Sequence, residues 1–560
     1  MNKKDNLIYP QADHTNCEHD REHQYWNRRD FLMTGGLASL GSVLLSGMPV
    51  SAVLGNALSA PLPADGDHIL VLIKMFGGND GLNMIVPSST AAGVEKYLQF
   101  RPTIGLIKGT DYADNHILSG FGSSDFAIPS TMESLMPLWA DGKMAVVHNV
   151  GYPKQDYSHF NSIDFWSSAA DNTYDKRLAS GIMGRFLDQD FPSFMETPPT
   201  VPPALRIGYS TDKIFTAPGN QQMELVFNDP NEFYRLAAYG KLYETEGFGE
   251  CPQGVERSYL RALTNNTLRY SQSVTNAYNK ASNKVSYPTN TQSRIAEQLA
   301  IIARLIKGRL GTRIFLVNID GFDTHSDQKA YHMRILGDLA KSVKAFYDDL
   351  KADSMQSNVG VMTYSEFGRT IKENGSNGTD HGNLSPLFLF GDGVKPGFHG
   401  SPINLDDSTL KNNDTIVYFE TQQSTDYRSV FQSVLRDWMC LGNELTEYTM
   451  GKKYTDLVLF KDPCKASFSS NNNAVLPGHN PNPVNARWID IKFSNLQSAE
   501  VELKVKSVSG KTLVVLHNKY TPKGSYTITL DPVKWKLPPG EYIYELSSFG
   551  KIYLRRFVIA

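Results

Sequence analysis

The stretch His68-Ile-Leu-Val-Leu-Ile-Lys-Met-Phe76, followed at once by Gly77-Gly78, decides the fold. A short and nearly continuous apolar run of this kind is typical of a strand buried on both faces of a parallel sheet. Similar runs recur along the chain at residues 144–148, 313–319, 359–363 and 387–390.

Helical patterns separate these runs. Apolar residues recur at spacings of three and four in residues 295–306 and 336–350, which predicts two amphipathic helices. Strands that alternate with helices predict an α/β fold with a mainly parallel sheet flanked by helices. Ligands of such sheets bind beyond the carboxyl ends of the strands, so we expect a functional site at that edge.

Composition sets the broad class. The chain has 560 residues, of which 41% are hydrophobic and 20% charged, and this is typical of a globular protein of more than one domain. The net charge is -3 and no basic tract occurs, so we expect no nucleic-acid partner. The four cysteines are too few for a disulfide scaffold. Cys440 and Cys464 are the nearer pair in sequence, although the sequence leaves the connectivity open.

The N-terminal 60 residues are interpreted as an export signal. Arg28-Arg29, with Phe31-Leu32 behind them, precede an apolar run at residues 33–58. That run is long enough for a transmembrane anchor, which is the alternative. Its many glycines, weak hydrophobicity and small residues at the end favour a twin-arginine signal. The translocase is then a partner, and the protein reaches the periplasm already folded.

The C-terminal part has a different pattern. Residues 466–483 are rich in Ser, Asn and Pro and are interpreted as a linker between an α/β domain at 65–460 and a domain at 484–560. Beyond the linker, short alternating runs predict about seven strands in a small all-β sandwich. The expected strands are 488–493, 500–505, 512–516, 525–530, 542–546 and 553–559.

Four polar clusters follow predicted strands. They are Gly77–Asn83, Tyr157–Ser162, Asp320–His325, and Ser365–Thr370 with Thr379–Asn383. Parallel topology brings them to one edge of the sheet, and carboxylates and imidazoles suit divalent cations. The candidate metal ligands are Asp80, Asp320, Asp323, His325, Glu366, Asp380 and His381. Zinc, calcium and magnesium are all candidates.

Three further residues are candidate catalytic groups. Ser158 opens a predicted helix with His159 behind it, so it can serve as a nucleophile at a positive helix end. Arg369 is expected to steady an anion. Each motif alone has a structural alternative: Gly77–Gly81 can be a tight turn, and Glu366 with Arg369 an ion pair. We interpret His148 and His332 as structural residues.

At these clusters the chain resembles the bacterial family called domain of unknown function 1501, over roughly residues 65–445. The stretches that carry the resemblance are Phe76–Asn83, Ser158–Phe160 with Trp166, Asp320–His325, Ser365–Thr370 and Asp380–Gly382. That family is similar to the alkaline phosphatase and sulfatase superfamily, whose enzymes use one or two metals and a Ser, Thr or modified Cys nucleophile. The resemblance implies an alkaline phosphatase-like fold.

The resemblance also implies roles. Asp80 matches the Asp after the first strand, and Asp320 with His325 matches a middle Asp and His, at a spacing one residue longer than usual. Glu366-Phe367 stands where an Asp-His is expected, and Asp380-His381 follows later. No Cys-x-Pro-x-Arg signature occurs, which argues against formylglycine sulfatase chemistry.

Residues 480–560 resemble a type IX secretion sorting domain. The matching pieces are Asn480–Asn485, Val505–Lys511 and Leu537–Tyr544. The resemblance implies the type IX machinery as a partner and a location at the cell surface or outside the cell. A carbohydrate-binding or spacer sandwich is the alternative.

Two functions follow from the sequence. The first is a metal-dependent hydrolase of phosphate or sulfate esters, acting on a small molecule or a glycan. The second is a non-catalytic exported protein that binds or assembles at the surface on the same fold. No motif in residues 195–290 names a substrate.

Overall fold

The structure is a computed structural model, and its first feature is that apolar strands and flanking helices form one large α/β part. It describes residues 68–88, 93–121, 125–171, 180–191, 199–209, 212–218, 221–231, 233, 265, 268–405, 419, 423–464, 474–475, 488–495, 498–507, 511–548 and 551–559. The predicted export signal at residues 1–60 lies outside the described residues.

A mixed sheet of nine strands forms the centre of the α/β part. In order across the sheet, its strands are β14 (Gly397–His399), β4 (Met144–Gly151), β13 (Ser385–Phe390), β10 (Val359–Tyr364), β1 (Ile69–Phe76), β9 (Ile314–Asp320), β5 (Ala204–Ile207) and β8 (Glu224–Phe227), while β15 (Thr425–Asp426) also pairs with β4. Only β13 runs against the others, because its pairs with β10 and β4 are antiparallel. The mainly parallel sheet that the sequence predicts is therefore present, with β1 central and parallel to β9 and β10.

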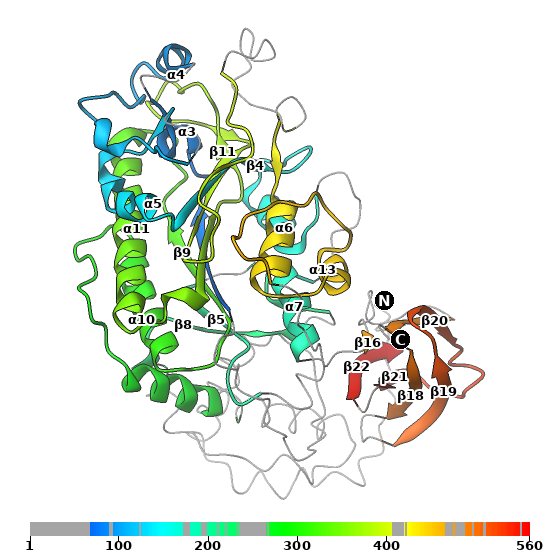
Figure 1. The fold of residues 1–560 in the computed structure, drawn as a ribbon. Helices are drawn as coiled ribbons and strands as arrows, with labels where there is room; N and C mark the ends of the chain where they lie inside the picture. The colour runs from blue at the N-terminus through cyan, green and yellow to red at the C-terminus, as the bar shows by residue number, and fades with distance from the viewer. Residues whose placement is uncertain are drawn as a thin grey trace, which may run out of the picture.

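Helices cover both faces of this sheet. In Figure 1, α10 and α11 lie along one face, and α6, α7 and α13 lie on the other. The helices are α3 (Gly81–Met84), α4 (Val94–Phe100), α5 (Met136–Ala140), α6 (His159–Ser168), α7 (Ile182–Asp190), α10 (Ile295–Lys307), α11 (Gln328–Ala352), α12 (Tyr427–Ser433) and α13 (Asn443–Met450). The apolar faces of α10 and α11 are buried, as the spacing of their Leu and Ile residues predicts.

Two antiparallel sheets make up the C-terminal part. One contains β16 (Ala474–Val475), β17 (Ile489–Asn495) and β20 (Gly524–Leu530), and the other contains β19 (Thr512–Thr521), β18 (Ala499–Ser507), β21 (Gly540–Ser548) and β22 (Lys551–Ile559). Apolar residues of both sheets form one hydrophobic cluster, which contains none of the residues of the main α/β core. The C-terminal sheets therefore bury a core of their own.

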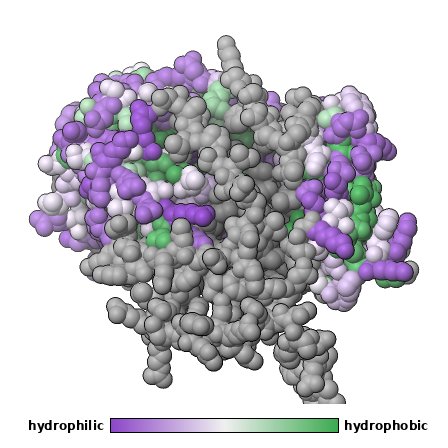
Figure 2. Space-filling view, turned by 90° about the horizontal axis from the view of Figure 1, so that it is seen from below, coloured by the Kyte–Doolittle hydropathy of each residue, from purple (hydrophilic) through white to green (hydrophobic). Residues whose placement is uncertain are grey.

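Within the described residues, no helix combines the length and the apolar character that crossing a membrane requires. On the face drawn in Figure 2, the described residues are mostly hydrophilic, and apolar residues gather in patches between them.

Candidate metal centre

The strand ends bring four loops together, as the sequence predicts for a parallel sheet. β1 and β9 end side by side, since Phe76 and Asp320 are register partners. A small hairpin after β10 adds the fourth loop: β11 (Gly368–Arg369) pairs with β12 (His381–Gly382), which puts His381 opposite Arg369.

Gly77 lets the first two loops approach each other. Its φ of +121° lies where glycine is favoured, and a Cβ there would stand 2.3 Å from the backbone nitrogen of Asp323. The backbone of Asp323 therefore packs directly against the end of β1. This close approach fixes Asp323 at the sheet edge.

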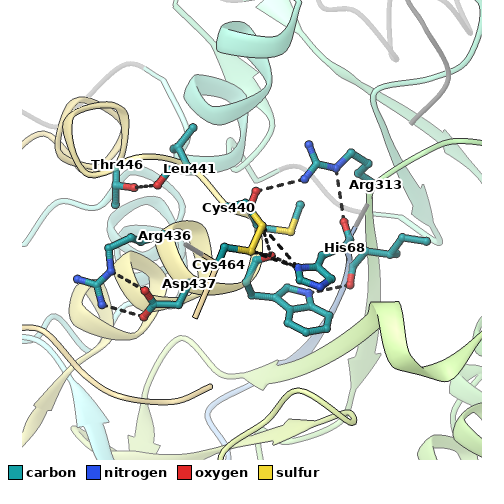
Figure 3. The surroundings of a disulfide bond; sticks show 11 residues. His68, Arg313, Arg436, Asp437, Cys440, Leu441, Thr446 and Cys464 are labelled. Carbon is teal, nitrogen blue, oxygen red and sulfur yellow. Dashed lines mark hydrogen bonds and ion pairs between the residues drawn. A yellow bond between two sulfur atoms is a disulfide. The ribbon is translucent and has the colours of Figure 1, made fainter. Parts of the chain in front are cut away.

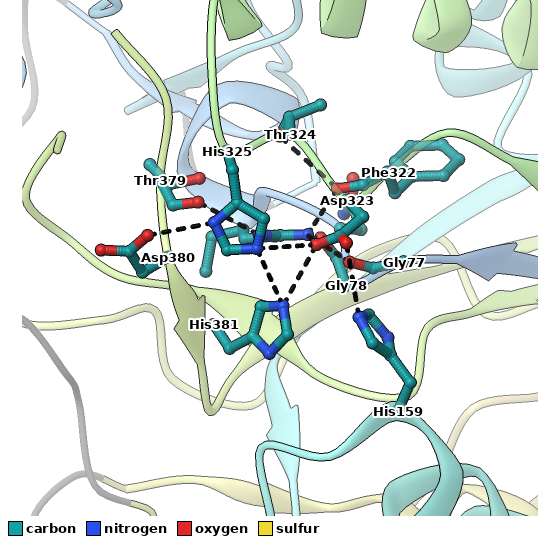
Figure 4. Close-up of polar contacts among 12 residues, drawn as sticks. Gly77, Gly78, His159, Phe322, Asp323, Thr324, His325, Thr379, Asp380 and His381 are labelled. Atoms are coloured by element: carbon teal, nitrogen blue, oxygen red, sulfur yellow. Dashed lines mark hydrogen bonds and ion pairs between the residues drawn. The ribbon is translucent and has the colours of Figure 1, made fainter. Parts of the chain in front are cut away.

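Three imidazoles and one carboxylate converge at this edge. We call His159, Asp323, His325 and His381 the Asp323 cluster, and Figure 4 shows these side chains pointing toward one another. The Nε2 atoms of His325 and His381 each lie 3.1 Å from Oδ1 of Asp323, and they lie 3.1 Å from each other. His159 Nε2 lies 3.6 Å from Oδ2 of the same carboxylate. The ligand atoms of His159, Asp323 and His381 all fall within 4.8 Å of one another.

A separate acceptor holds the other ring nitrogen of each histidine. Nδ1 of His159 lies 2.8 Å from Oε1 of Glu366, and Nδ1 of His325 lies 3.0 Å from Oδ1 of Asp380. Nδ1 of His381 lies 2.8 Å from the carbonyl oxygen of Tyr157.

These contacts orient the rings. A carbonyl oxygen or a carboxylate only accepts, so each Nδ1 donates a proton and each Nε2 is the ring atom that faces Asp323. In a neutral ring that Nε2 carries the lone pair that a metal ion needs, and in an imidazolium it carries a proton that Asp323 accepts. Two imidazole nitrogens on a tetrahedral zinc ion stand about 3.3 Å apart, close to the His325–His381 spacing.

Charge around Asp323 keeps it ionised. Partial burial raises the pKa of its carboxyl, but hydrogen bonds and charges from Arg369, His381 and His325 hold it below its usual value. Asp380 behaves alike, because Asn374 and His325 more than offset its desolvation and lower its pKa. The cluster therefore has an anionic ligand available over the whole physiological range.

Arg369 lies beside the cluster as a brace. Its side chain is fully buried, and it donates to the carbonyl oxygens of Gly78, Thr379 and Phe322 at 2.7, 3.1 and 2.9 Å. It also donates to the carbonyl of Gly77 and to Oδ1 of Asp323. These contacts tie three loops together. The expectation that Arg369 steadies a bound anion does not agree with this geometry, because its donors are already engaged.

Asp80 lies away from the cluster. Both oxygens of its buried carboxylate accept from Arg101, at 2.7 and 2.8 Å, and Gln328 donates to it as well. Burial raises the pKa of Asp80, but Arg101 more than compensates and the pKa falls below its usual value. Among the described residues, no hydrogen bond or ion pair joins it to the Asp323 cluster, so the geometry does not support it as a ligand.

Glu366 and Asp380 lie behind the ligands. The fully buried Glu366 accepts from the backbone nitrogen of Gly77 at 2.9 Å and from His159, so it orients a histidine where a direct ligand was expected. Asp380 has the same place behind His325. Asp320 ends β9, and burial and the nearby Glu366 raise its pKa while Lys74 lowers it. No contact of Asp320 with the cluster is seen in the described part.

Ser158 lies beside the cluster as the residue before His159, at the N-cap of α6. Its backbone nitrogen donates to Asp156 at 2.6 Å, and its hydroxyl does not cap the helix. Sequence reasoning did not identify the carbonyl of Tyr157 as an orienting group, since a backbone acceptor leaves no residue-type signal.

The model of the family described as "Protein of unknown function (DUF1501)" matches residues 257–446. That segment is less than half of the chain, and it contains Asp323, His325 and His381 but not His159. A search of the curated proteins found no match.

Solved structures give low-identity likenesses. A protein in the alkaline phosphatase superfamily from Vibrio parahaemolyticus is 8% identical, with a TM-score of 0.30 over 84% of this chain and 85% of that one. The PsFucS1 sulfatase from Pseudoalteromonas sp. is 10% identical, with a TM-score of 0.29 over 91% and 89%. The alkaline phosphatase of the Antarctic bacterium TAB5 is 10% identical, with a TM-score of 0.26 over 60% and 94%. Likenesses this low carry no argument about activity, which has to come from the site.

Proposed function

We propose that this protein is a metal-dependent hydrolase of phosphate or sulfate esters, with its cation held by His159, Asp323, His325 and His381. The convergence of the Nε2 atoms of three imidazoles on one carboxylate carries the proposal. Each imidazole is oriented by an acceptor behind it, which is the usual arrangement around a protein-bound metal.

The donor set selects among the candidate ions. Three imidazoles and one carboxylate suit zinc or a similar transition ion better than calcium or magnesium, which prefer oxygen ligands. Such an ion, when bound, polarises an ester oxygen and makes bound water more acidic. The protein orients the rings through Glu366 and Asp380 and fixes the loops through Arg369.

Ser158 is the candidate nucleophile. It directly precedes a ligand, its hydroxyl is not used in capping, and α6 directs its positive end toward it. The ester class rests on the resemblance of the four strand-end segments to the domain of unknown function 1501 family, which is similar to the alkaline phosphatase and sulfatase superfamily.

A second candidate is a non-catalytic metal-binding protein. Two observations favour it: four protein donors complete a tetrahedral site without an open position, as structural zinc sites do, and the nearest guanidinium, that of Arg369, is fully engaged.

One experiment separates the two candidates. Protein purified from the periplasm is analysed for metal and assayed with an aryl phosphate and an aryl sulfate, beside the variants His381→Ala and Ser158→Ala. Metal together with turnover that both variants lose supports the hydrolase and its nucleophile. Turnover that Ser158→Ala retains and His381→Ala loses indicates that water, and not the Ser158 hydroxyl, attacks the ester. Bound metal without turnover of either ester supports the second candidate.

We further propose that the protein is exported by the twin-arginine translocase and delivered outward by a type IX machinery. The motifs for export lie at Arg28 and Arg29, outside the described residues. Replacing both by Lys should leave precursor in the cytoplasm, because recognition of a guanidinium pair is not satisfied by ammonium groups. Normal export of that variant by the same machinery contradicts the proposal.

A further inference from the structure

A second group of metal-binding atoms lies at the opposite edge of the sheet, before the amino ends of β1 and β9. Cys440 and Cys464, the nearer pair in a sequence that left the connectivity open, form a disulfide with a Cα–Cα distance of 5.2 Å. His68 lies against this disulfide, as Figure 3 shows. These three residues have no part in the Asp323 cluster or in the proposed hydrolysis.

The donor atoms are close together. Nδ1 of His68 lies 3.7 Å from Sγ of Cys440 and 3.6 Å from Sγ of Cys464. The carbonyl oxygen of Trp438 lies 3.5 and 3.8 Å from the same two sulfurs. The ligand atoms of His68 and the two cysteines all fall within 4.8 Å of one another.

The histidine ring is held in place. It stacks on the indole of Trp438, with ring centroids 4.0 Å apart and planes at 9°. Its Nδ1 donates to the carbonyl of Trp438 at 2.6 Å, and Arg313 donates to the carbonyls of His68 and Met439 at 3.4 and 3.2 Å. Nδ1 therefore points at both sulfurs without a change of rotamer.

The distances from Nδ1 to the two sulfurs suit a tetrahedral ion, whereas the sulfurs, which are bonded in the disulfide, have to move to about 3.8 Å from each other after reduction. A zinc ion with ordinary bond lengths to an imidazole nitrogen and a thiolate holds the two atoms about 3.6 Å apart. We propose that, once the disulfide is reduced, His68, Cys440 and Cys464 bind a soft or borderline cation such as Zn²⁺ or Cu⁺, with the carbonyl of Trp438 at the fourth position.

The chemistry is balanced. A phosphine reductant with water gives its two electrons to the disulfide, which takes up two protons and becomes two thiols, while the phosphine becomes its oxide. A Zn²⁺ ion then replaces the two thiol protons, which pass to solvent. The imidazole proton moves from Nδ1 to Nε2 through solvent, so Nδ1 exchanges its hydrogen bond for a bond to the ion.

As a consequence, the segment that ends at Cys464 is held to the α/β part in either redox state. Cys464 ends a segment that pairs with the body of the domain through Lys395 and Gly393, which bond to Leu459 and Lys461. Under oxidising conditions the disulfide fastens this segment, and under reducing conditions the metal fastens it with the same side chains.

Cobalt gives a direct test, because thiolate-to-Co²⁺ charge transfer absorbs in the near ultraviolet and the Asp323 cluster contains no sulfur. Full-length protein is reduced with the phosphine and titrated with Co²⁺ without oxygen. We expect one equivalent of thiolate-bound Co²⁺, displaced by Zn²⁺, and no such absorption from the oxidised protein.

Variants make the test specific. Cys464→Ser should abolish the absorption, and His68→Gln, which keeps both cysteines and so retains the disulfide, should weaken Co²⁺ binding at least tenfold. The double variant Cys17→Ser/Cys251→Ser and the variant Asp323→Asn should keep the absorption. An unchanged affinity in His68→Gln, absorption that persists in Cys464→Ser, or absorption lost with Cys17 and Cys251 overturns the proposal, whether or not the protein hydrolyses esters.

Discussion

Asp80 and Asp323 both follow strands that lie side by side, yet their surroundings are opposite. Asp80 is 1% exposed and pairs with the buried Arg101, while Gln328 donates to it and His332 lies near. The side chain of Asp323 is 46% exposed and faces three imidazoles through their Nε2 atoms. Both carboxylates have a guanidinium partner, but Asp323 is also open to solvent and surrounded by ring nitrogens.

The comparison shows that a guanidinium partner does not by itself exclude an Asp as a ligand, since Arg369 reaches Asp323 as Arg101 reaches Asp80. What differs is that Asp80 is enclosed, whereas Asp323 is half exposed and also faces three imidazoles. Asp80 and Arg101 hold the loop after β1 in place, and the Asp323 cluster depends on that loop because Gly77 packs against Asp323. Asp80 therefore contributes mainly to stability, and the neighbouring Asp323 contributes mainly to binding.

The largest expected effect comes from breaking the buried pair. Arg101→Met should lower the free energy of unfolding of the α/β part by about 3–5 kcal/mol, because it leaves the carboxylate of Asp80 buried without a partner. Denaturant unfolding of the variant and of wild type measures this difference in free energy. The double variant Arg101→Met/Asp80→Asn should recover part of the lost stability. Equal stability of Arg101→Met and wild type would contradict the view that Asp80 stabilises the fold through Arg101.

The matching change in the exposed cluster should affect binding more than stability. Asp323→Asn should weaken zinc affinity roughly 1000-fold, about 4 kcal/mol, which is beyond the loss typical of an outer partner. The free energy of unfolding of the metal-free protein should fall by about 1–2 kcal/mol, less than in Arg101→Met, because the buried Arg369 loses a charged acceptor but keeps its carbonyl partners. Isothermal titration with zinc and urea unfolding test both halves, and a large stability loss without a change in affinity reverses the assignment.

The buried region should respond to pH through His332. Burial lowers the pKa of this imidazole from 6.5 to about 4, against the opposing charge of Asp80. Between pH 4 and 6.5 the unfolded chain therefore binds more protons at this residue than the folded chain does. The free energy of unfolding is at its full value above pH 6.5, and it falls by about 3 kcal/mol as the pH drops through 4. His332→Gln, which can still donate to Asn79, should flatten this part of the profile, and an unchanged slope argues against His332 as its source.

Glu366 should give the smallest effect. Glu366→Gln keeps the shape of the side chain but weakens its hold on Nδ1 of His159, and zinc affinity should fall about 10–100-fold. Glu297→Gln serves as the control, because Glu297 is an exposed glutamate that pairs with Arg294, and it should leave zinc affinity unchanged. A loss as large as that of Asp323→Asn would instead make Glu366 a direct ligand.

Much of this arrangement could be expected from the sequence. The apolar runs mark β1, β4, β9, β10 and β13, because strands buried on both faces need uninterrupted apolar residues. β5 and β8 were not identified, since four residues such as Ala204–Ile207 carry too little pattern. The C-terminal strands alternate and were identified closely.

The site was harder to read. The sequence grouped Asp323, His325 and His381 by strand order alone, but it treated His159 as a catalytic group. It could not separate ligands from the residues behind them, because that depends on long-range contacts such as Arg101 with Asp80 and His159 with Glu366. Composition carries no record of these contacts.

The disulfide also sets how force passes through the molecule. The described α/β part begins at His68 and its last segment ends at Cys464, and the two residues touch. A pull on the chain beyond Cys464 is borne by the covalent bond to Cys440, so the hydrogen bonds of the segment before it carry no load. The Asp323 cluster lies a full strand away, roughly 25 Å along the eight residues of β1. Tension on the chain after Cys464 therefore enters the α/β part at the edge of the sheet opposite to the Asp323 cluster.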